Sequence, residues 1–232
     1  MKIIYVLILN LFLTIGFLNA SEEIKPSKAT LEIDLGPELE VQMLKLSNGL
    51  WKLTSSADYG SLYKRRESEI FELKDNQIKP LSYEFSERRL FKRQKNSAEF
   101  NWENNEVKFN LGKKEGSILL EGNVLGPSSA SLQLRLDFRK YGGKNIPNEI
   151  SYLVYWKGSI KNRTYKVQTA KETVQTEMGT YDAYKVSRIF EKGSKRKQIF
   201  WLAPKLDYAV IKIADINDTE SEIKIKSFEE TG

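Results

Sequence analysis

Histidine and cysteine, which carry much of nucleophilic and metal-assisted chemistry, are absent from the 232-residue sequence. Their absence excludes Ser-His-Asp and Cys-His nucleophile systems and every metal site built on imidazole or thiolate ligands. No Gly-rich phosphate-binding loop and no Gly-x-Ser-x-Gly elbow occurs, which argues against nucleotide-binding and α/β-hydrolase proteins. The stretch Asp215-Ile216-Asn217-Asp218 lacks the Gly and the Glu of a calcium loop. We therefore predict neither a metal site nor a cofactor.

Carboxylates, tyrosines and basic side chains are the chemical groups that remain. A pair of carboxylates could support glycoside hydrolysis, and a Tyr beside a Lys or Arg could abstract a proton from a sugar. With 31 Asp and Glu residues and 11 Tyr residues, such pairs arise by chance. We therefore predict a protein that is not an enzyme.

Aromatic residues in alternating segments are the best candidates for contact with a ligand. Tyr83, Trp102, Tyr152 and Trp156 each lie in such a segment beside other aromatic residues. On a concave sheet face they could stack on a sugar or contact a lipid. Core packing is the alternative for each of them, because aromatic side chains dominate the cores of β proteins.

Basic residues occur in clusters, although the net charge is only +6. The clusters are residues 64–66, 88–89 and 92–95, together with a patch formed by Lys195, Arg196 and Lys197. They could attract anionic lipid headgroups or acidic glycans, or they could be solvated hairpin tips. The segment from Lys192 to Lys197, which contains this patch, is also the candidate contact for an envelope protein. A nucleic-acid partner is not expected, because no binding motif is recognisable.

The N-terminal 20 residues have the pattern of a secretory signal peptide. Lys2 precedes an apolar run over residues 3–18, and the small Ala20 is followed by the polar Ser21. We predict export to the periplasm with cleavage after Ala20; a retained membrane anchor is the alternative. No later apolar stretch approaches the roughly 18 residues of a transmembrane helix, so the mature chain should not span a membrane.

The remainder of the chain has the pattern of half-buried antiparallel strands. Short runs alternate between apolar and polar residues and are separated by turn-forming residues, of which Asn48-Gly49 is the strongest hairpin signal. We predict a flexible lead-in over residues 21–30 and a single, mainly β domain over 31–230. Its sheet should be antiparallel and curved, or closed into a partly open β-barrel. Without Cys, core burial and strand pairing must hold this fold together.

Residues 128–141 allow two interpretations. Leu132, Leu134, Leu136 and Phe138 alternate as in a strand, but Ser128 or Ser129 could cap the start of a helix and Gly142-Gly143 could end one. We favour one short helix. Ala130, Leu134, Phe138 and Tyr141 would then share one face and Leu132 and Leu136 the opposite one, so the helix would be buried on two sides.

Several short motifs resemble a family of exported bacterial proteins known as domain of unknown function 3108. The matching segments are Phe71-Glu72-Leu73, the run 75–80, Tyr83, Arg88, 100–102, 178–181, 184–188, Trp201-Leu202-Ala203-Pro204 and 208–213. Tyr208-Ala209-Val210 departs from the Leu-Pro-Val that is commoner in the family, and Asn101 stands where Asp is commoner, which argues against an essential carboxylate there. The resemblance implies an envelope location and a curved or barrel-like antiparallel fold, and no established activity.

Three hypotheses for function follow. The first is a non-catalytic periplasmic binding or carrier module whose curved sheet encloses a lipid-like or glycolipid ligand. The second is a structural or protein-interaction module of the envelope. The third is a glycan-active enzyme that uses Tyr or carboxylate chemistry.

Overall fold

The computed structural model describes residues 24–33, 36–143, 145–216 and 220–231, so the predicted signal peptide lies outside the described residues. The described residues form one 15-stranded sheet, one α-helix and one 3₁₀ turn. The helix is α1 (Ser129–Tyr141) and the turn is η1 (Pro204–Leu206). The strands are β1 (Ser27–Ile33), β2 (Leu39–Lys45), β3 (Trp51–Tyr59), β4 (Tyr63–Lys74), β5 (Gln77–Arg89), β6 (Lys92–Asn101), β7 (Glu106–Asn110), β8 (Glu115–Leu119), β9 (Val124–Leu125), β10 (Glu149–Tyr155), β11 (Ile160–Thr176), β12 (Gly179–Ile189), β13 (Lys197–Ala203), β14 (Ala209–Ile216) and β15 (Glu220–Glu230).

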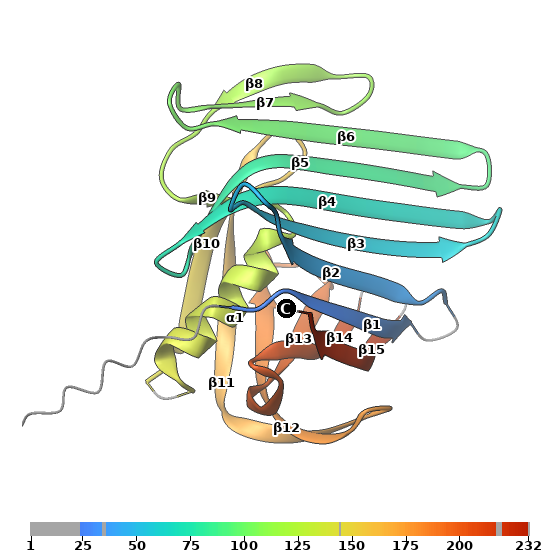
Figure 1. Ribbon diagram of the computed structural model, residues 1–232, viewed down its shortest axis with the longest axis vertical. Helices are drawn as coiled ribbons and strands as arrows, with labels where there is room; N and C mark the ends of the chain where they lie inside the picture. Colours follow the sequence, from blue (N-terminus) through green and yellow to red (C-terminus); the bar gives the residue numbers. More distant parts are fainter. Residues whose placement is uncertain (1–23, 34–35, 144, 217–219, 232) are drawn as a thin grey trace, which may run out of the picture.

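The strand order is β8-β7-β6-β5-β4-β3-β2-β1-β15-β14-β13-β12-β11-β10-β9. Neighbours pair antiparallel except β9 and β10, which are parallel. The sheet curves strongly, and β8 and β9 remain as its two edges, so the barrel is open (Figure 1). The prediction of a curved, barrel-like antiparallel sheet is confirmed.

The first strand begins earlier than the sequence suggested. Residues 27–30 were expected to belong to a flexible lead-in, but they form the start of β1, and Ile24 is already buried. These residues form a strand because β1 pairs with β2 on one side and with β15 on the other. Their polar composition gives no sign of this pairing. Strand β1 therefore joins the N-terminal and C-terminal halves of the sheet.

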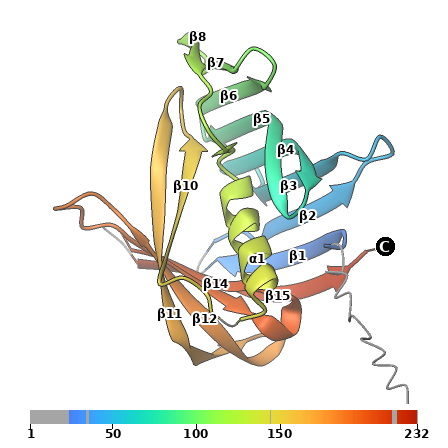
Figure 2. The ribbon, with the colours of Figure 1, turned by 90° about the vertical axis from the view of Figure 1, so that its left-hand side faces the viewer.

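Segment 128–141 is a helix, as favoured, and it lies inside the curve of the sheet. Figure 2 shows α1 between the β1–β6 half and the β10–β12 part of the sheet. Leu132 and Leu136 pack in one hydrophobic cluster, and Leu134 and Phe138 pack in a second. Ala130 joins the first cluster rather than the expected second one. Burial on both sides explains why apolar residues alternate in a helix.

The two ends of α1 are capped differently. Gly142 adopts φ 57° and its N–H donates to the Arg139 carbonyl at 2.9 Å, so it ends the helix as predicted. At the start, neither serine hydroxyl caps the helix, contrary to expectation. The side chain of Glu69, from β4, instead accepts the N–H groups of Ser128 and Ser129 at the start of the helix. None of the helices in the described part of the chain is long and apolar enough to cross a membrane.

Candidate binding site on the concave face

Cross-strand pairing places the side chains of six strands in rows on the concave face of the sheet. Residues directly opposite each other in antiparallel strands point to the same face, so each row runs from β1 to β6. In that order, the rows are Leu31, Leu39, Ala57, Arg65, Glu87, Gln94; Ala29, Val41, Ser55, Glu67, Phe85, Asn96; and Ser27, Met43, Leu53, Glu69, Tyr83, Ala98. The first two rows change from apolar residues on β1 and β2 to residues on β4 to β6 that are charged or polar, except for Phe85.

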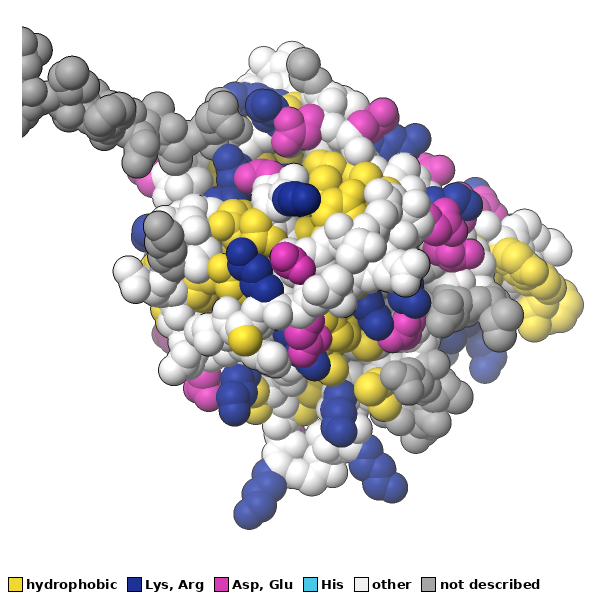
Figure 3. Space-filling view, turned by 90° about the horizontal axis from the view of Figure 1, so that it is seen from below, with side chains coloured by type: hydrophobic (Ala, Val, Ile, Leu, Met, Phe, Trp, Pro, Cys, Tyr) yellow, Lys and Arg dark blue, Asp and Glu magenta, His cyan; other side chains and the backbone are white. Residues whose placement is uncertain are grey.

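An apolar cavity lies where the hydrophobic part of these rows faces α1. Its volume is about 200 Å³, and Leu132 and Arg135 of α1 form part of its wall. The other lining residues are Ser27, Ala29, Leu31, Leu39, Val41, Met43, Leu53, Ser131, Phe200, Ala209, Val210, Ile213, Ile225 and Phe228. Figure 3, which views the molecule from below, shows hydrophobic side chains reaching the surface in the middle of this view with charged side chains around them.

A polar pocket lies where the charged part of the rows faces the start of α1. Its volume is about 350 Å³, and Pro127 lies at the end nearest the helix. It is lined by Arg65, Glu67, Tyr83, Phe85, Glu87, Arg89, Gln94, Asn96, Leu111, Pro127, Tyr155, Trp156 and Lys157. The two cavities therefore share one concave face.

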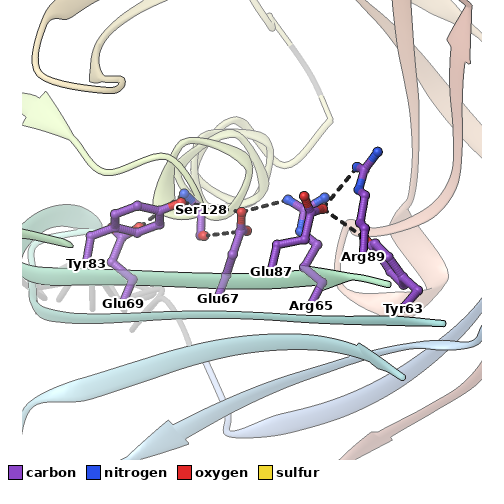
Figure 4. A network of polar contacts seen from close by, with 8 residues as sticks. All are labelled: Tyr63, Arg65, Glu67, Glu69, Tyr83, Glu87, Arg89 and Ser128. Atoms are coloured by element: carbon purple, nitrogen blue, oxygen red, sulfur yellow. Dashed lines mark hydrogen bonds and ion pairs between the residues drawn. The ribbon is translucent and has the colours of Figure 1, made fainter. Parts of the chain in front are cut away.

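A network of ion pairs and hydrogen bonds organises the polar pocket (Figure 4). Glu67 Oε1 pairs with Arg65 Nη2 at 2.7 Å and accepts a 3.4 Å bond from the Tyr83 hydroxyl, while its Oε2 accepts the Ser128 hydroxyl at 3.3 Å. Glu87 Oε1 pairs with Arg89 at 3.0 Å and lies 3.4 Å from the Tyr63 hydroxyl. Burial, chiefly, raises the pKa of Tyr83, so its phenol is neutral near neutral pH.

Glu69 links this network to the helix. Its Oε2 accepts the N–H groups of Ser128 and Ser129 at 3.1 and 3.2 Å, and its side chain is fully buried. Loss of hydration raises the pKa of Glu69 to about 7, although the hydrogen bonds from the two serines act in the opposite direction. Its other oxygen, Oε1, has no partner among the described groups. The start of α1 is thus fixed by a carboxyl group that titrates near neutrality.

A second polar anchor holds α1 where it borders the apolar cavity. Arg135 donates to the Asp207 carbonyl and to Asp207 Oδ2, each at 2.8 Å, and Arg139 pairs with Asp207 Oδ1 at 2.9 Å. Asp207 closes the η1 turn with φ 51°. Burial lowers the pKa of Arg135, but its paired guanidinium stays charged because its usual pKa is 12.5. One charged group therefore lies in the wall of an otherwise uncharged and mainly apolar cavity.

The sequence matches the model of the family described as "Protein of unknown function (DUF3108)" over residues 41–224. The chain belongs to the DUF3108 family. A search of curated proteins gives no match. Among solved structures, a crystal structure of a β-barrel-like protein of domain of unknown function DUF1849 from Brucella abortus is similar, with a TM-score of 0.57 and 11% identity over 90% of this chain and 99% of that one. This similarity concerns the fold.

A second solved structure gives a weaker match. It is a putative outer membrane lipoprotein-sorting protein domain from Vibrio parahaemolyticus, with a TM-score of 0.24 and 9% identity over 90% of this chain and 87% of that one. A score this low does not establish a shared fold.

Two of the four aromatic residues selected from the sequence of this DUF3108 protein meet in the polar pocket. Tyr83 is buried there, and Trp156 is 41% exposed. Trp102 lies in a separate hollow, where its Nε1 donates to the Pro80 carbonyl at 2.7 Å. The Tyr152 hydroxyl donates to Asp137 Oδ2 at 2.6 Å, and the ring packs against both clusters beside α1. Trp102 and Tyr152 therefore line neither the polar pocket nor the apolar cavity.

The residues of the apolar cavity were not found from the sequence. Leu39, Val41 and Met43 alternate visibly, but alternation marks any core-facing strand and does not distinguish a cavity wall from a filled core. The basic patch of Lys195, Arg196 and Lys197 is exposed in the structure, and Arg196 pairs with Asp215 at 2.6 Å. No group of three acidic side chains suited to a metal ion occurs in the described part of the DUF3108 chain.

Proposed function

We propose that this protein is a non-catalytic binding or carrier module of the bacterial envelope that holds an amphipathic ligand, a lipid or a glycolipid. The observation that carries the proposal is the division of one concave face into the apolar cavity at β1 to β3 and the polar pocket at β4 to β6. An amphipathic molecule has the same division. The open barrel supports the proposal, because curved antiparallel sheets commonly enclose such ligands.

The apolar cavity would hold hydrocarbon. Its lining is dominated by aliphatic and aromatic side chains, and burying a chain there would release ordered water from both surfaces. At about 200 Å³ it is smaller than a typical ligand pocket of roughly 300–1,000 Å³. We therefore infer that it takes part of an acyl chain, or that α1 shifts to admit a longer one.

The polar pocket would hold the headgroup. Arg65, Arg89 and Lys157 offer donors for phosphate or carboxylate oxygens, and Gln94 and Asn96 can bond hydroxyl groups. The exposed ring of Trp156 could stack on a sugar, although the side chains of Arg163 and Lys157 now lie over it at 5.3 Å. Sugar and anionic headgroups both fit this set of side chains.

Export of the protein belongs to the same proposal. The apolar N-terminal run followed by Ala20 supports secretion with cleavage after Ala20, and a secreted carrier would meet its ligand in the periplasm. A periplasmic lipid needs cover from water, which the cavity beneath α1 could give.

A glycan-active enzyme is the second candidate, because Glu67, Glu87 and Tyr83 meet beside Arg65 in the polar pocket. Two observations favour binding over catalysis. Both carboxylates are engaged with arginines, and the raised pKa of Tyr83 makes its phenolate, the form that acts as a base, scarce. Release of reducing sugar from cell-wall or envelope glycans, abolished by Glu67→Gln, would overturn the non-catalytic proposal.

Native mass spectrometry of protein purified gently from a bacterial periplasm tests the carrier proposal. We expect a bound mass that disappears on organic extraction and returns on incubation with envelope lipid extract. A clean apo mass after that incubation would contradict the proposal and favour an interaction module.

A pair of variants on β2 tests the location of the site. Val41 lines the apolar cavity, whereas Gln42 points to the opposite face of the same strand. Val41→Phe should fill the cavity and lower the affinity for a fluorescent fatty acid by about tenfold or more, while Gln42→Phe should leave it unchanged. Equal affinities in the two variants would place the ligand elsewhere.

A further inference from the structure

The tips of two neighbouring hairpins expose large hydrophobic side chains. Tyr59 and Leu62 lie at the β3–β4 tip and Leu90 and Phe91 at the β5–β6 tip, and Phe91 is 100% exposed. They are four of the eight large hydrophobic side chains that are exposed among the described residues. In Figure 1 both tips project to the right, well beyond α1, and hydrophobic side chains protrude at the right-hand edge of Figure 3.

The two tips form one surface rather than two separate loops. The N–H of Leu90 donates to the Leu62 carbonyl at 2.9 Å, and Arg88 Nη2 donates to the Gly60 carbonyl at 3.0 Å. The hydrophobic side chains of both tips are therefore held at the same end of the sheet. We call these two segments, residues 58–66 and 87–95, the hairpin-tip surface.

The hairpin-tip surface is strongly basic. Its two segments contain eight Lys and Arg residues and two acidic residues, Asp58 and Glu87. Pairing places Lys64, Arg88 and Arg93 side by side in one row, and Arg89 opposite Lys92. Like charges directly opposite each other destabilise a sheet unless an anion neutralises them. Lys92, Arg93 and Lys95 have no ion-pair partner among the described residues.

The β5–β6 turn is also unfavourable for folding alone. Leu90 has φ 48°, a left-handed conformation that Asn and Gly adopt far more easily than Leu. The β4–β5 turn has Asp75 and Asn76 at its two positive-φ positions, which is the usual solution. The strain at Leu90 is not offset by packing, because Leu90 and Phe91 are both exposed. Such strain is commonly retained where it serves function.

We propose that the hairpin-tip surface docks the protein onto a lipid bilayer that contains anionic lipids, with Leu62, Leu90 and Phe91 entering the headgroup region. The basic residues behind the tips would contact the anionic headgroups, since each Lys or Arg near such a surface adds to binding. Apolar tips with cations behind them match a membrane interface, which is apolar inside and negative at its surface. This inference goes beyond the proposed function, because Leu62, Leu90 and Phe91 line neither the apolar cavity nor the polar pocket.

Co-sedimentation with vesicles tests the proposal on the chain from Ser21 to Gly232, which contains every described residue. We expect binding to vesicles of phosphatidylglycerol and phosphatidylcholine in equal parts, and at least about tenfold weaker binding to phosphatidylcholine alone. Raising the ionic strength should weaken the first interaction. Absence of binding to the anionic vesicles would overturn the proposal.

Two double variants separate the contributions of the apolar and basic residues. Leu90→Asn with Phe91→Ser removes the hydrophobic tip and relieves the left-handed Leu. Lys92→Glu with Arg93→Glu replaces like-charge pairs with opposite-charge pairs across β5 and β6. Both should fold, and each should weaken vesicle binding by about tenfold or more.

Matched controls carry the same changes elsewhere. Lys195→Glu with Lys197→Glu reverses two charges in the other exposed basic patch, and Leu119→Asn removes another exposed Leu. Neither should change vesicle binding by more than about twofold. Equal losses in controls and tip variants, or a loss only in the 195/197 variant, would overturn the proposal.

The absence of Cys allows a direct test of insertion. A single Cys introduced as Ser61→Cys at the β3–β4 tip can carry an environment-sensitive fluorophore. Its emission should shift to the blue with anionic vesicles but not with phosphatidylcholine. An unchanged spectrum in protein that sediments with anionic vesicles would exclude insertion of the tips.

Discussion

Glu69 occupies the space that a side chain at position 126 would need. A Cβ atom built on Gly126 would lie 2.2 Å from Glu69 Oε1, while Glu69 Oε2 accepts the N–H groups of Ser128 and Ser129. The missing side chain at Gly126 lets a residue of β4 reach the start of α1. The helix is thereby placed against the concave face at the boundary between the apolar cavity and the polar pocket.

Gly126→Ala should therefore destabilise the protein through Glu69. We expect a loss of about 2–4 kcal/mol in the free energy of unfolding, because the added methyl displaces the carboxyl group that caps α1. Glu69→Ala alone should cost about 1–2 kcal/mol, the usual value of a helix cap. In the double variant the methyl has room, so the combined loss should fall short of the sum by at least about 1 kcal/mol. Simple additivity in chemical denaturation would refute the steric link.

The titration of Glu69 should make stability depend on pH. Its pKa is raised from 4.5 to about 7 in the folded protein, so the unfolded chain ionises first as the pH rises. The stabilisation that Glu69 contributes is thus fully present below about pH 4.5. It is lost as the pH rises through about 7, and the total loss is on the order of 3 kcal/mol. Glu69→Gln should remove this component. Between about pH 5 and pH 8 the wild type loses this stabilisation and the variant does not. The free energy of unfolding of Glu69→Gln should therefore rise relative to that of the wild type over this range.

Glu72→Gln is the control for this pH profile, because Glu72 is exposed on the same strand. Its profile should follow the wild type throughout the range. A Glu69→Gln profile parallel to the wild type would show that the buried carboxyl group titrates normally.

The ion pairs of Asp207 and of Asp215 should differ in strength because they differ in burial. Asp207 pairs with Arg135 and Arg139, whose side chains are 9% and 15% exposed, whereas Arg196 beside Asp215 is 43% exposed. Asp207→Asn removes the negative charge that both guanidinium groups contact and should cost about 2 kcal/mol. Asp215→Asn should cost less than about 1 kcal/mol. Equal losses in the two variants would mean that the Asp207 anchor is no stronger than a surface pair.

Local patterns in the sequence predicted the fold and the position of α1, but not the site. Alternation with a period of two shows which face of a strand is buried, and Gly142 marks the end of the helix. Both signals involve only neighbouring residues, so they can be recognised in the sequence. The Glu69 cap joins residues about sixty positions apart, so no local pattern contains it. The cavity walls come from both halves of the chain, from Ser27 to Phe228.

The candidate aromatic residues illustrate the same limit. Tyr83 and Trp156 meet in the polar pocket because β5 and the end of β10 face each other across the start of α1. Trp102 and Tyr152 had equally good local patterns, yet their polar atoms are bonded to Pro80 and Asp137. The period of two along a strand predicts which face of the sheet a side chain lies on. The curvature of the sheet determines where on that face a cavity forms.

The β5–β6 tip should be more stable without its hydrophobic residues. Leu90 is held at φ 48°, so Leu90→Asn should relieve strain and raise the free energy of unfolding by about 0.5–1 kcal/mol. Phe91→Ser should add little, because Phe91 is fully exposed. Thermal and urea unfolding of the double variant check this, with Leu119→Asn as the control in which an exposed Leu is replaced without left-handed strain. A tip variant that is more stable and yet binds vesicles more weakly would mean that the natural turn gives up stability for docking. A less stable variant would mean that Leu90 and Phe91 support the fold, and that their exposure needs no membrane to explain it.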